Sequence, residues 1–409
     1  MKWSTQPAVN RSRTGSSPVF RPIIDYWFGT VKVPNFLFAR HIDLSHQNKY
    51  NWGEKIYDGE KMKVFNYSKL KDAKWDIDIV NYLTAIHEEK GKQQLYLKQL
   101  PLELDKLVEI AKIQSTESSN EIEGIRTTDT RLRQIVNDKT TPKNRAEAEI
   151  AGYRDALEVV HENFDSILIT PNFILQLHDI LLSHAASSYG GKFKNVQNYI
   201  SATDRNGKSY TLFTPLSPFE TPIAMQGLCD EYNRAIGEGV VDPLILIPIF
   251  IHDFLCIHPF IDGNGRMSRL LTTLLLYRSG YYVGKYISLE AKIVKNKDLY
   301  YDAFYDSQQN WHENKDDPTP FIKYLLSTII SAYRDFEERV ELVKEKKPAL
   351  EIVRQAINTK IGKFSKRDIM ELVPSLSSTS VERSLQELCN AGEIKKIGSG
   401  RATAYFVIK

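Results

Sequence analysis

Twelve consecutive residues, HPFIDGNGRMSR at 258–269, combine side chains that can bind a phosphate chain with one that can move a proton. The Gly-Asn-Gly triplet at 263–265 directly precedes a leucine-rich helical run. Backbone N–H groups in such a loop, together with the N-terminus of the following helix, form a concavity that binds anions. Glycine also allows the close backbone approach that a phosphate needs. The triplet therefore predicts an anion-binding nest.

Charged residues surround this nest. Arg266 and Arg269 are three residues apart on the first turn of the following helix, so both can face one side. Two guanidinium groups suit a polyphosphate better than a lone phosphate. Asp262 is a hard oxygen ligand where Mg²⁺ would bridge phosphate oxygens, and His258 can accept a proton near neutral pH. The residues indicate a nucleotide polyphosphate, Mg²⁺ and a histidine base; the alternative is a tight loop between core helices whose arginines form surface ion pairs.

Other kinds of site are disfavoured. The P-loop pattern GxxxxGK[ST] is absent. His252 lies six residues before His258, but the ligand set is incomplete, which argues against a zinc site. The three cysteines form no CxxC pair, so they argue against a disulfide framework and fit a reducing cytosol.

The length of the chain and the distribution of its charge indicate how it is divided into domains. The chain has 409 residues and a net charge of +3, too small to indicate a nucleic-acid partner for the whole chain. Residues 344–409 hold 13 Lys or Arg and 7 Asp or Glu, a net of +6, which leaves −3 for the rest. The apolar stretch at 243–251 is far short of the roughly 20 residues that span a bilayer. We therefore expect a cytoplasmic protein without a membrane partner, in which a basic module follows a mildly acidic body.

Helical spacing of apolar residues dominates the body and predicts a mainly α fold. The helices are expected at 76–112, 144–164, 171–184, 222–236, 243–257, 267–277 and 319–346. Asp242 and Pro243 form an N-cap and first-turn pair for one of them, and Pro248 should kink that helix or mark its true start. Ser279-Gly280 should end the helix after the motif.

The segment 190–217 breaks the helical pattern. VQNYI and YTLF are short β-prone runs on either side of DRNGK, in which Asn206-Gly207 is a strong hairpin signal. A lone hairpin is marginal by itself. We expect it to lean on the core or to act as a mobile flap.

The two ends of the chain differ from the body. Residues 1–61 are expected to be an irregular extension, with Met62 as the native start, because 1–24 are rich in Ser, Pro and Arg and lack the apolar core of a secretory signal. Residues 347–409 predict three helices and a hairpin, the order of a winged helix-turn-helix. The expected elements are 349–359, KRDIMEL capped by Ser365, VERSLQELCNA opened by Ser377 and closed by Gly392, and the strands EIKKI and AYFVI.

The sequence is compatible with more than one partner for this C-terminal module. Lys395, Lys396 and Arg401 on the wing could meet DNA phosphates, whereas Glu382 and Glu387 on the third helix dilute a basic face. The alternatives are a docking surface for protein, including a homodimer contact, or plain structural support.

HPFIDGNGRMSR resembles the signature of the Fic family, HPFx(D/E)GNGRxxR, at every defined position, and the resemblance covers roughly residues 62–340. It implies a Fic-type helical bundle with a β-hairpin flap, followed here by the small winged helix-turn-helix domain. It also implies transfer of AMP from ATP to a Tyr, Thr or Ser hydroxyl of a target protein, with auto-AMPylation and release of pyrophosphate. The resulting domains are 1–61, a helical region at 62–165, the catalytic core with its connecting helix at 166–346, and 347–409.

The resemblance also implies roles for single residues. His258 would deprotonate the target hydroxyl, and Asp262 would hold Mg²⁺. Gly263, Asn264 and Gly265 would hold the α- and β-phosphates of ATP. Arg266 would bind the β-phosphate, and Arg269 would bind the γ-phosphate. A Fic subgroup that acts as a kinase has alanine where Gly263 stands and lysine where Gly265 stands, so the present residues favour adenylylation.

Two further parts of the site follow from the resemblance. The hairpin is similar to the Fic flap, which clamps a target segment by strand addition. Adenine would lie after the motif helix, where Asn296, Tyr300 and Tyr301 are the candidates. A pair of tyrosines in a helix is more often part of a hydrophobic core.

A second motif, SSNEIEG at 118–124, fits the inhibitory pattern (S/T)xxxE(G/N) through Ser119, Glu123 and Gly124. The resemblance implies an ion pair between Glu123 and Arg269. A bidentate carboxylate on Arg269 would remove the partner of the γ-phosphate and place negative charge in its pocket. On composition alone, Ser118 and Glu121 could instead form a capping box at a helix start.

Competing functions remain. One is a transcription regulator whose body only senses ATP, and another is a toxin-type or interaction module with a degenerate site. The same site could also remove AMP from proteins by hydrolysis. The intact base, metal ligand and arginine pair favour the transferase, since a pure sensor would not need a positioned base.

Overall fold

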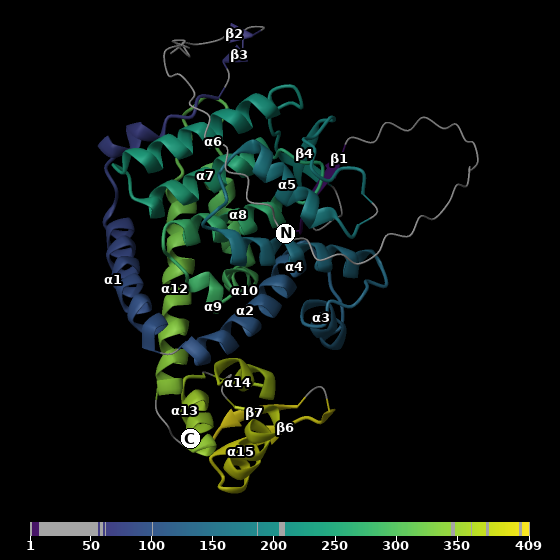
Figure 1. Cartoon of the computed structure of the whole chain (residues 1–409), viewed down its shortest axis with the longest axis vertical. Coiled ribbons are helices and arrows are strands. Elements are labelled where there is room, and N and C mark those ends of the chain that lie inside the picture. The colour runs from purple at the N-terminus through teal and green to yellow at the C-terminus, as the bar shows by residue number, and fades with distance from the viewer. Residues whose placement is uncertain are drawn as a thin grey trace, which may run out of the picture. The chain divides into compact units, whose positions relative to one another are not determined.

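The computed structural model describes residues 2–7, 56–57, 60–61, 63–99, 101–185, 187–203, 209–344, 348–360, 362–373, 376–400 and 403–408. These residues form a mainly helical fold with small sheets (Figure 1). The chain divides into two units, Met1–Pro7 with Lys63–Lys409 and Ala8–Met62. In the second unit, the described residues form one antiparallel pair, β2 (Ile56–Tyr57) with β3 (Glu60–Lys61).

Twelve helices and a 3₁₀ turn make up the described part of the body. They are η1 (Tyr67–Asp72), α1 (Ile77–Gln99), α2 (Pro101–Ile122), α3 (Asp129–Val136), α4 (Arg145–Asn163), α5 (Pro171–Leu182), α6 (Thr221–Glu238), α7 (Pro243–Ile257), α8 (Asn264–Arg278), α9 (Val283–Tyr286), α10 (Leu289–Lys295), α11 (Lys297–Ser307) and α12 (Thr319–Lys344).

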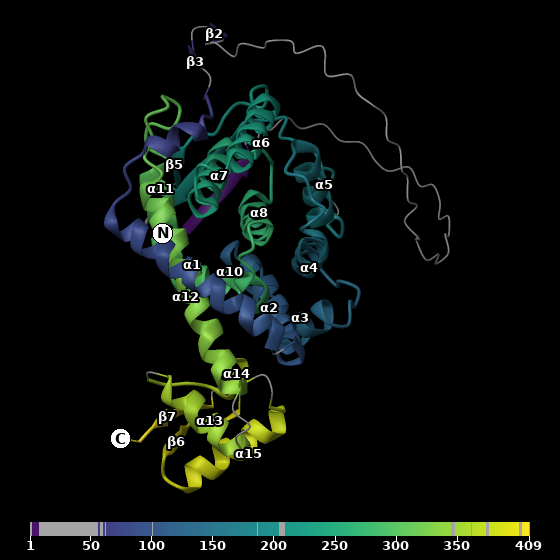
Figure 2. The same cartoon turned by 60° about the vertical axis from the view of Figure 1, so that its left-hand side comes forward.

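The hydrophobic core lies around α7 and α8. Every residue of α7 from Leu244 to Ile257 is buried, because the segment is apolar on all sides and neighbouring helices cover it. α6 packs on α7, and α4 and α5 pack against α8 (Figure 2). The six residues 258–263 connect α7 to α8, so the motif lies between two helices that the core holds in place.

Two prolines affect the helices in different ways. Pro248 lies inside α7 and does not mark its start, since the helix begins at Pro243 behind the Asp242 N-cap as predicted. The helical stretch expected at 76–112 divides into α1 and α2 at Pro101, whose missing N–H costs nothing at the first position of a helix. α1 then packs along α12.

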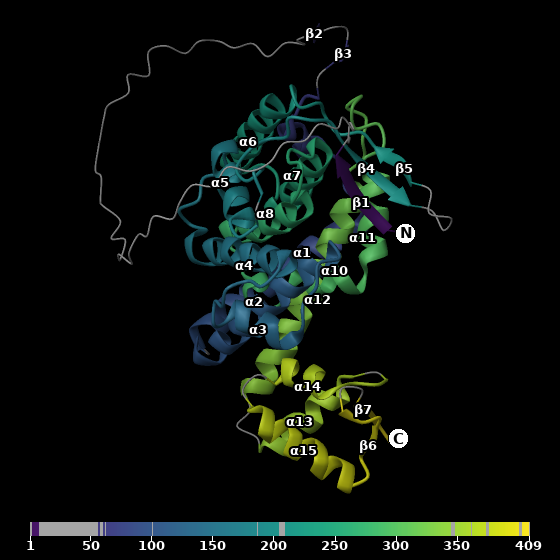
Figure 3. The same cartoon turned by 90° about the vertical axis from the view of Figure 1, so that its right-hand side faces the viewer.

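The predicted hairpin is present as β4 (Asn198–Thr203) and β5 (Ser209–Phe213), which pair in antiparallel register with a bulge at Ile200/Ser201. Its turn, with Asn206-Gly207, lies outside the described residues. β1 (Lys2–Pro7) adds to the other edge of β4, with Lys2 opposite Thr203 (Figure 3). The expectation of an irregular stretch at 1–61 is therefore wrong for residues 2–7, 56–57 and 60–61, which form strands. The other residues of 8–62 lie outside the described residues.

The C-terminal elements are those predicted. They are α13 (Ala349–Asn358), α14 (Lys366–Leu372), α15 (Ser378–Asn390), β6 (Ile394–Ile397) and β7 (Ala404–Val407). Ser365 forms a capping box with Asp368, Ser377 caps α15, and Gly392 follows that helix with φ of 73°. These elements share a core of their own, yet they belong to the same compact unit as the body.

Among the described residues, no helix is long and apolar enough to cross a membrane.

Candidate functional site

The loop between α7 and α8 holds an unusual backbone. His258 ends α7 with φ of 50°, in the left-handed region that is costly for a residue other than glycine. Gly263 precedes α8 with φ of 87°, where a glycine is at no disadvantage. Phe260 anchors the loop as predicted, because it is fully buried and stacks on His178 at a centroid distance of 3.7 Å.

The His258 ring presents a free nitrogen. Its Nδ1 lies 3.2 Å from the carbonyl oxygen of Leu255, so Nδ1 carries the hydrogen and Nε2 the lone pair. Among the described residues, Nε2 has no hydrogen-bond partner. Burial, and next the charge of Lys194, lower the pKa of His258 to about 4. The imidazole is therefore unprotonated at neutral pH, which is the state a general base needs.

The nest forms at the start of α8, which begins at Asn264, three residues earlier than predicted. The Asn264 side chain closes the loop: its Oδ1 accepts from Phe260 N (2.9 Å) and its Nδ2 donates to Phe260 O (2.7 Å). Asp262 accepts from Gly263 N at 2.6 Å, and its side chain is 43% exposed. The carboxylate thus faces the open side of the nest, where a cation ligand would need to be.

The two motif arginines lie close to the nest but have different partners. Arg266 is 1% exposed and forms an ion pair of 3.0 Å with Glu149 of α4, while Asp262 lies 3.4 Å away. Arg145 donates to the other Glu149 oxygen at 2.8 Å. Nε of Arg266 has no hydrogen-bond partner among the described residues.

Arg269 is held by the end of α2. Its Nε donates to Ser119 Oγ at 2.8 Å, and its Nη2 donates to Ser119 O at 2.9 Å and to Glu123 Oε1 at 2.7 Å. The predicted pair of Glu123 with Arg269 is present. The bidentate geometry is not, because Ser119 occupies Nε and only one carboxylate oxygen contacts the guanidinium.

Glu123 also lies against the first turn of α8. A Cβ placed on Gly265 would lie 2.3 Å from Glu123 Oε1, so only glycine leaves room for this carboxylate. The capping-box alternative for Ser118 and Glu121 is wrong, since both lie within α2 and not at a helix start.

The adenine candidates lie on or beside α11. Tyr300 is 5% exposed and packs edge-on against Tyr301 and Tyr324. Together with Arg269 it lines a small cavity under α8. Asn296 is exposed between α10 and α11. Their role in holding adenine stays a prediction.

The residues fit a bound polyphosphate with a divalent cation. The Glu123 carboxylate already places an anion beside the N-terminus of α8, where backbone N–H groups and the helix dipole favour negative charge. The unpartnered Nε of Arg266 is a buried donor that a phosphate oxygen could satisfy. Asp262 offers the hard oxygen that Mg²⁺ prefers.

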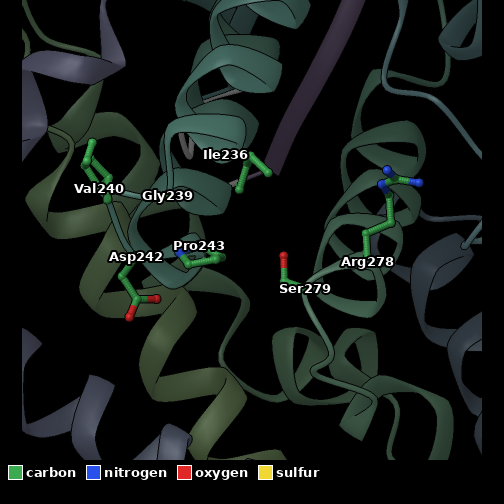
Figure 4. A pocket seen from close by; sticks show the side chains of 8 residues that line it. Ile236, Gly239, Val240, Asp242, Pro243, Arg278 and Ser279 are labelled. Atoms are coloured by element: carbon green, nitrogen blue, oxygen red, sulfur yellow. The ribbon is translucent and has the colours of Figure 1, made fainter.

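Two other features have their own explanations. The cavity in Figure 4 lies at the far ends of α7 and α8 from the motif, and its Asp242 and Arg278 are already paired, with His87 and with backbone carbonyls. In the described part of the chain, one group of potential metal ligands comprises His252, Asp253 and Asp316. The Lys63 ammonium, 2.6 Å from Asp316, already supplies the cation there.

Among the residues that contact the motif and that sequence reasoning missed are Glu149, Lys194 and Asn198. They come from α4 and from the segment that leads into β4, far from the motif in sequence. No local spacing indicates such contacts.

Comparisons with known proteins show which family the segment that carries the motif resembles. The sequence model of the Fic/DOC family matches residues 168–276. "Protein adenylyltransferase Fic" of Drosophila willistoni is 32% identical over 134 residues, which are 32% of this chain and 25% of that protein. The Drosophila yakuba protein of the same name is 29% identical over 203 residues, 49% of this chain and 37% of that protein. The chain thus spans a quarter to somewhat over a third of these relatives.

Two crystal structures share the fold. A Fic family protein from Desulfovibrio desulfuricans covers 82% of this chain and 97% of its own, with a TM-score of 0.54 and 20% identity. A Fic domain containing signaling protein from Bacteroides thetaiotaomicron covers 63% and 97%, with a TM-score of 0.54 and 24% identity. Residues 168–276 therefore match the Fic/DOC family, and the fold is similar to that of these two proteins. That segment holds the nest, the free imidazole and both arginines.

Proposed function

We propose that this chain transfers AMP from ATP to a hydroxyl side chain of a target protein. The observation that carries the proposal is the unpartnered, unprotonated Nε2 of His258 beside an anion-binding helix N-terminus. A base in this position has no use in a protein that only senses a nucleotide. The relatives' name, protein adenylyltransferase, agrees with this activity.

The chemistry follows from the positions of the side chains. His258 Nε2 takes the proton of the target hydroxyl while that oxygen bonds to the α-phosphorus of ATP. The bond from the α-phosphorus to the bridging oxygen of the β-phosphate breaks, and pyrophosphate leaves with that oxygen. The Gly263–Gly265 nest and Arg266 hold the α- and β-phosphates, and Arg269 holds the γ-phosphate. Asp262 would hold Mg²⁺, whose charge would offset that of the phosphates.

We propose that Glu123 restrains this reaction. The carboxylate occupies Arg269 Nη2 and lies against Gly265, so a γ-phosphate cannot use the same donor. ATP then binds without its full set of contacts and in a non-productive position. Ser119 stabilises the restrained state by accepting two hydrogen bonds from the same guanidinium.

The flap supplies the place for the target. β4 lies beside the base, because the Asn198 side chain at its first position donates to the His258 carbonyl at 3.1 Å. The outer edge of β4 accepts an extended segment, since β1 pairs along it over six residues. A target segment that replaced β1 on that edge would bring its hydroxyl toward Nε2 by strand addition.

For the C-terminal module we propose a winged helix-turn-helix that contacts protein and not DNA. On α15, Arg383 pairs with Glu387, and Lys366 of α14 pairs with Glu382, so the third helix offers little free positive charge. Arg367 of α14 instead contacts Glu117 of α2 at 2.6 Å. A mobility-shift assay tests this: binding to DNA with a steep salt dependence would contradict the proposal.

The transferase proposal is tested with ATP labelled at the α- or the γ-phosphate. Glu123→Gly is incubated with each nucleotide in cell lysate, and His258→Ala in the same background is the control. We expect protein-bound label from the α-position only, and none with the control. Label retained from the γ-position would mean a kinase, and no label from either would refute the transferase.

A further inference from the structure

The four carbonyl oxygens of Ile257, His258, Pro259 and Phe260 all accept hydrogen bonds from one short segment. Lys194 Nζ donates to Ile257 O at 3.0 Å, and Lys194 N donates to Pro259 O at 2.8 Å. These bonds span the end of α7 and the first half of the motif loop.

The Asn198 side chain donates hydrogen bonds to the other two carbonyl oxygens. Its Nδ2 donates to His258 O at 3.1 Å and to Phe260 O at 2.9 Å, while its Oδ1 accepts from Lys194 Nζ at 2.9 Å. Asn198 is also the first residue of β4. One side chain therefore joins the flap strand to the backbone that carries the base.

Burying the Lys194 ammonium to make these contacts costs desolvation free energy. The residue is 3% exposed, and in the described part of the chain its Nζ donates only to the two neutral oxygens. Burial lowers the pKa of Lys194 to about 7. No carboxylate of the described residues forms an ion pair with Lys194, and only the charge of Glu220 opposes the effect of burial on its pKa. A buried cation held in this way is rarely kept for packing alone.

We propose that Lys194 and Asn198 are positioning residues that fix the flap strand relative to His258, so that the hydroxyl of a target segment paired with β4 in place of β1 meets Nε2. The left-handed backbone of His258 needs such support, because a strained conformation persists only where its surroundings over-determine it. Because β4 is also the edge on which a target would lie, the same bonds set the distance between acceptor and base. This inference rests on the transferase proposed above.

The test measures transfer in the Glu123→Gly background, with His258→Ala chain in excess as acceptor and α-labelled ATP as donor. Asn198→Ala, Asn198→Asp and Lys194→Met are compared with the exposed neighbours Asn195→Ala and Lys192→Met as controls. Asn198→Asp keeps an acceptor for Lys194 but loses both donated bonds. Lys194→Met keeps the length of the buried stem, and thermal denaturation shows which variants are folded.

We expect kcat to fall about 10- to 100-fold in all three variants, while the KM for ATP changes less than about twofold. The controls stay within about twofold of the parent. A purely structural role would lower the melting temperature and leave kcat of the folded protein unchanged, and that result would overturn the inference.

Amide hydrogen exchange provides a readout that needs no transfer. Asn198→Ala should raise exchange at Lys194 N and Phe260 N, whereas Asn195→Ala should not. If the parent transfers no label but exchange rises, the transferase proposal fails and the anchoring of the loop stands. If exchange is unchanged, the anchoring itself is refuted.

Discussion

Arg266 and Arg269 lie three residues apart on α8, and each forms an ion pair with a carboxylate that is distant in sequence, yet the two pairs differ in kind. The Glu149 side chain is 8% exposed, lies within α4 and also forms an ion pair with Arg145. Glu123 is 35% exposed, follows the last residue of α2 and contacts Arg269 through a single oxygen. In the proposed transferase, the first pair would orient Arg266, and the second is the contact that the γ-phosphate would replace.

The burial of the two pairs explains the difference. Removing one member of a buried ion pair leaves the other charged and desolvated, at a cost of about 3–5 kcal/mol. A pair that water partly reaches contributes little by comparison. A displaceable inhibitor must belong to the second class, because a deeply buried carboxylate could not leave without destabilising the fold.

Glu149→Ala should therefore have the largest effect. In the Glu123→Gly background we expect transfer to fall about 100-fold, because Arg266 loses its orientation, and stability to fall by about 3 kcal/mol. Kinetics and urea denaturation measure the two effects. Glu149→Gln, which keeps an acceptor oxygen, should lie between. If Glu149→Ala instead activated the chain as Glu123→Gly does, the two pairs would not differ in kind.

Gly265→Ala tests the contact on the other arginine. The added Cβ would lie 2.3 Å from Glu123 Oε1 and force this carboxylate away from Arg269. In the Gly265→Ala background, adding Glu123→Gly should raise transfer less than about threefold, compared with at least about tenfold in the parent. Gly227→Ala, whose Cβ meets Phe65 at an ordinary 3.5 Å, is the control. An undiminished ratio would mean that Glu123 does not act from this position.

Lys297→Met should have a smaller effect on the same contact. Its ammonium donates to Ile122 O at the end of α2, where a cation is favourable for the helix dipole. Its loss should loosen the last turn that carries Glu123 and raise basal transfer about threefold, measured with labelled ATP. The exposed Lys295→Met should change nothing. A fall in transfer would show that Lys297 contacts ATP.

Mild acid should change the rate least. Guanidinium groups do not titrate in proteins, so neither Arg266 nor Arg269 changes its charge as the pH falls. We therefore expect any loss of rate at low pH to come from protonation of His258. Burial lowers the pKa of His258 to about 4, and the unprotonated form is the active one. Glu123→Gly should therefore vary less than about twofold in rate between pH 6 and 8 and lose activity only as the pH approaches 4. A drop centred near pH 6.5 would contradict this assignment.

The sequence predicted the parts of the site that are contiguous or belong to a known pattern. The motif, the pairing of Glu123 with Arg269, the anchor Phe260 and the caps of α7, α14 and α15 follow from local residue types. Local pattern also predicted the hairpin and the C-terminal element order.

Contacts between distant segments could not be predicted in the same way. Glu149 is one of several charged residues on α4, and nothing in its spacing distinguishes it from the exposed ones until the fold brings α4 against α8. Lys194 looks like any lysine before a hairpin, and only the structure shows that it is buried. The single-oxygen contact of Glu123 depends on Ser119 occupying the other side of the guanidinium, which a motif does not encode.

The central claim is that Glu123 and the γ-phosphate compete for Arg269. The most direct test is calorimetric binding of ATP and of ADP with Mg²⁺, with His258→Ala in every chain to prevent turnover. The chain with Glu123 intact should bind the two nucleotides about equally. With Glu123→Gly, ATP should bind at least about tenfold more tightly than ADP, and adding Arg269→Ala should abolish this preference. If the ratio of the dissociation constants for ATP and ADP were the same with and without Glu123, Glu123 and the γ-phosphate would not compete for Arg269.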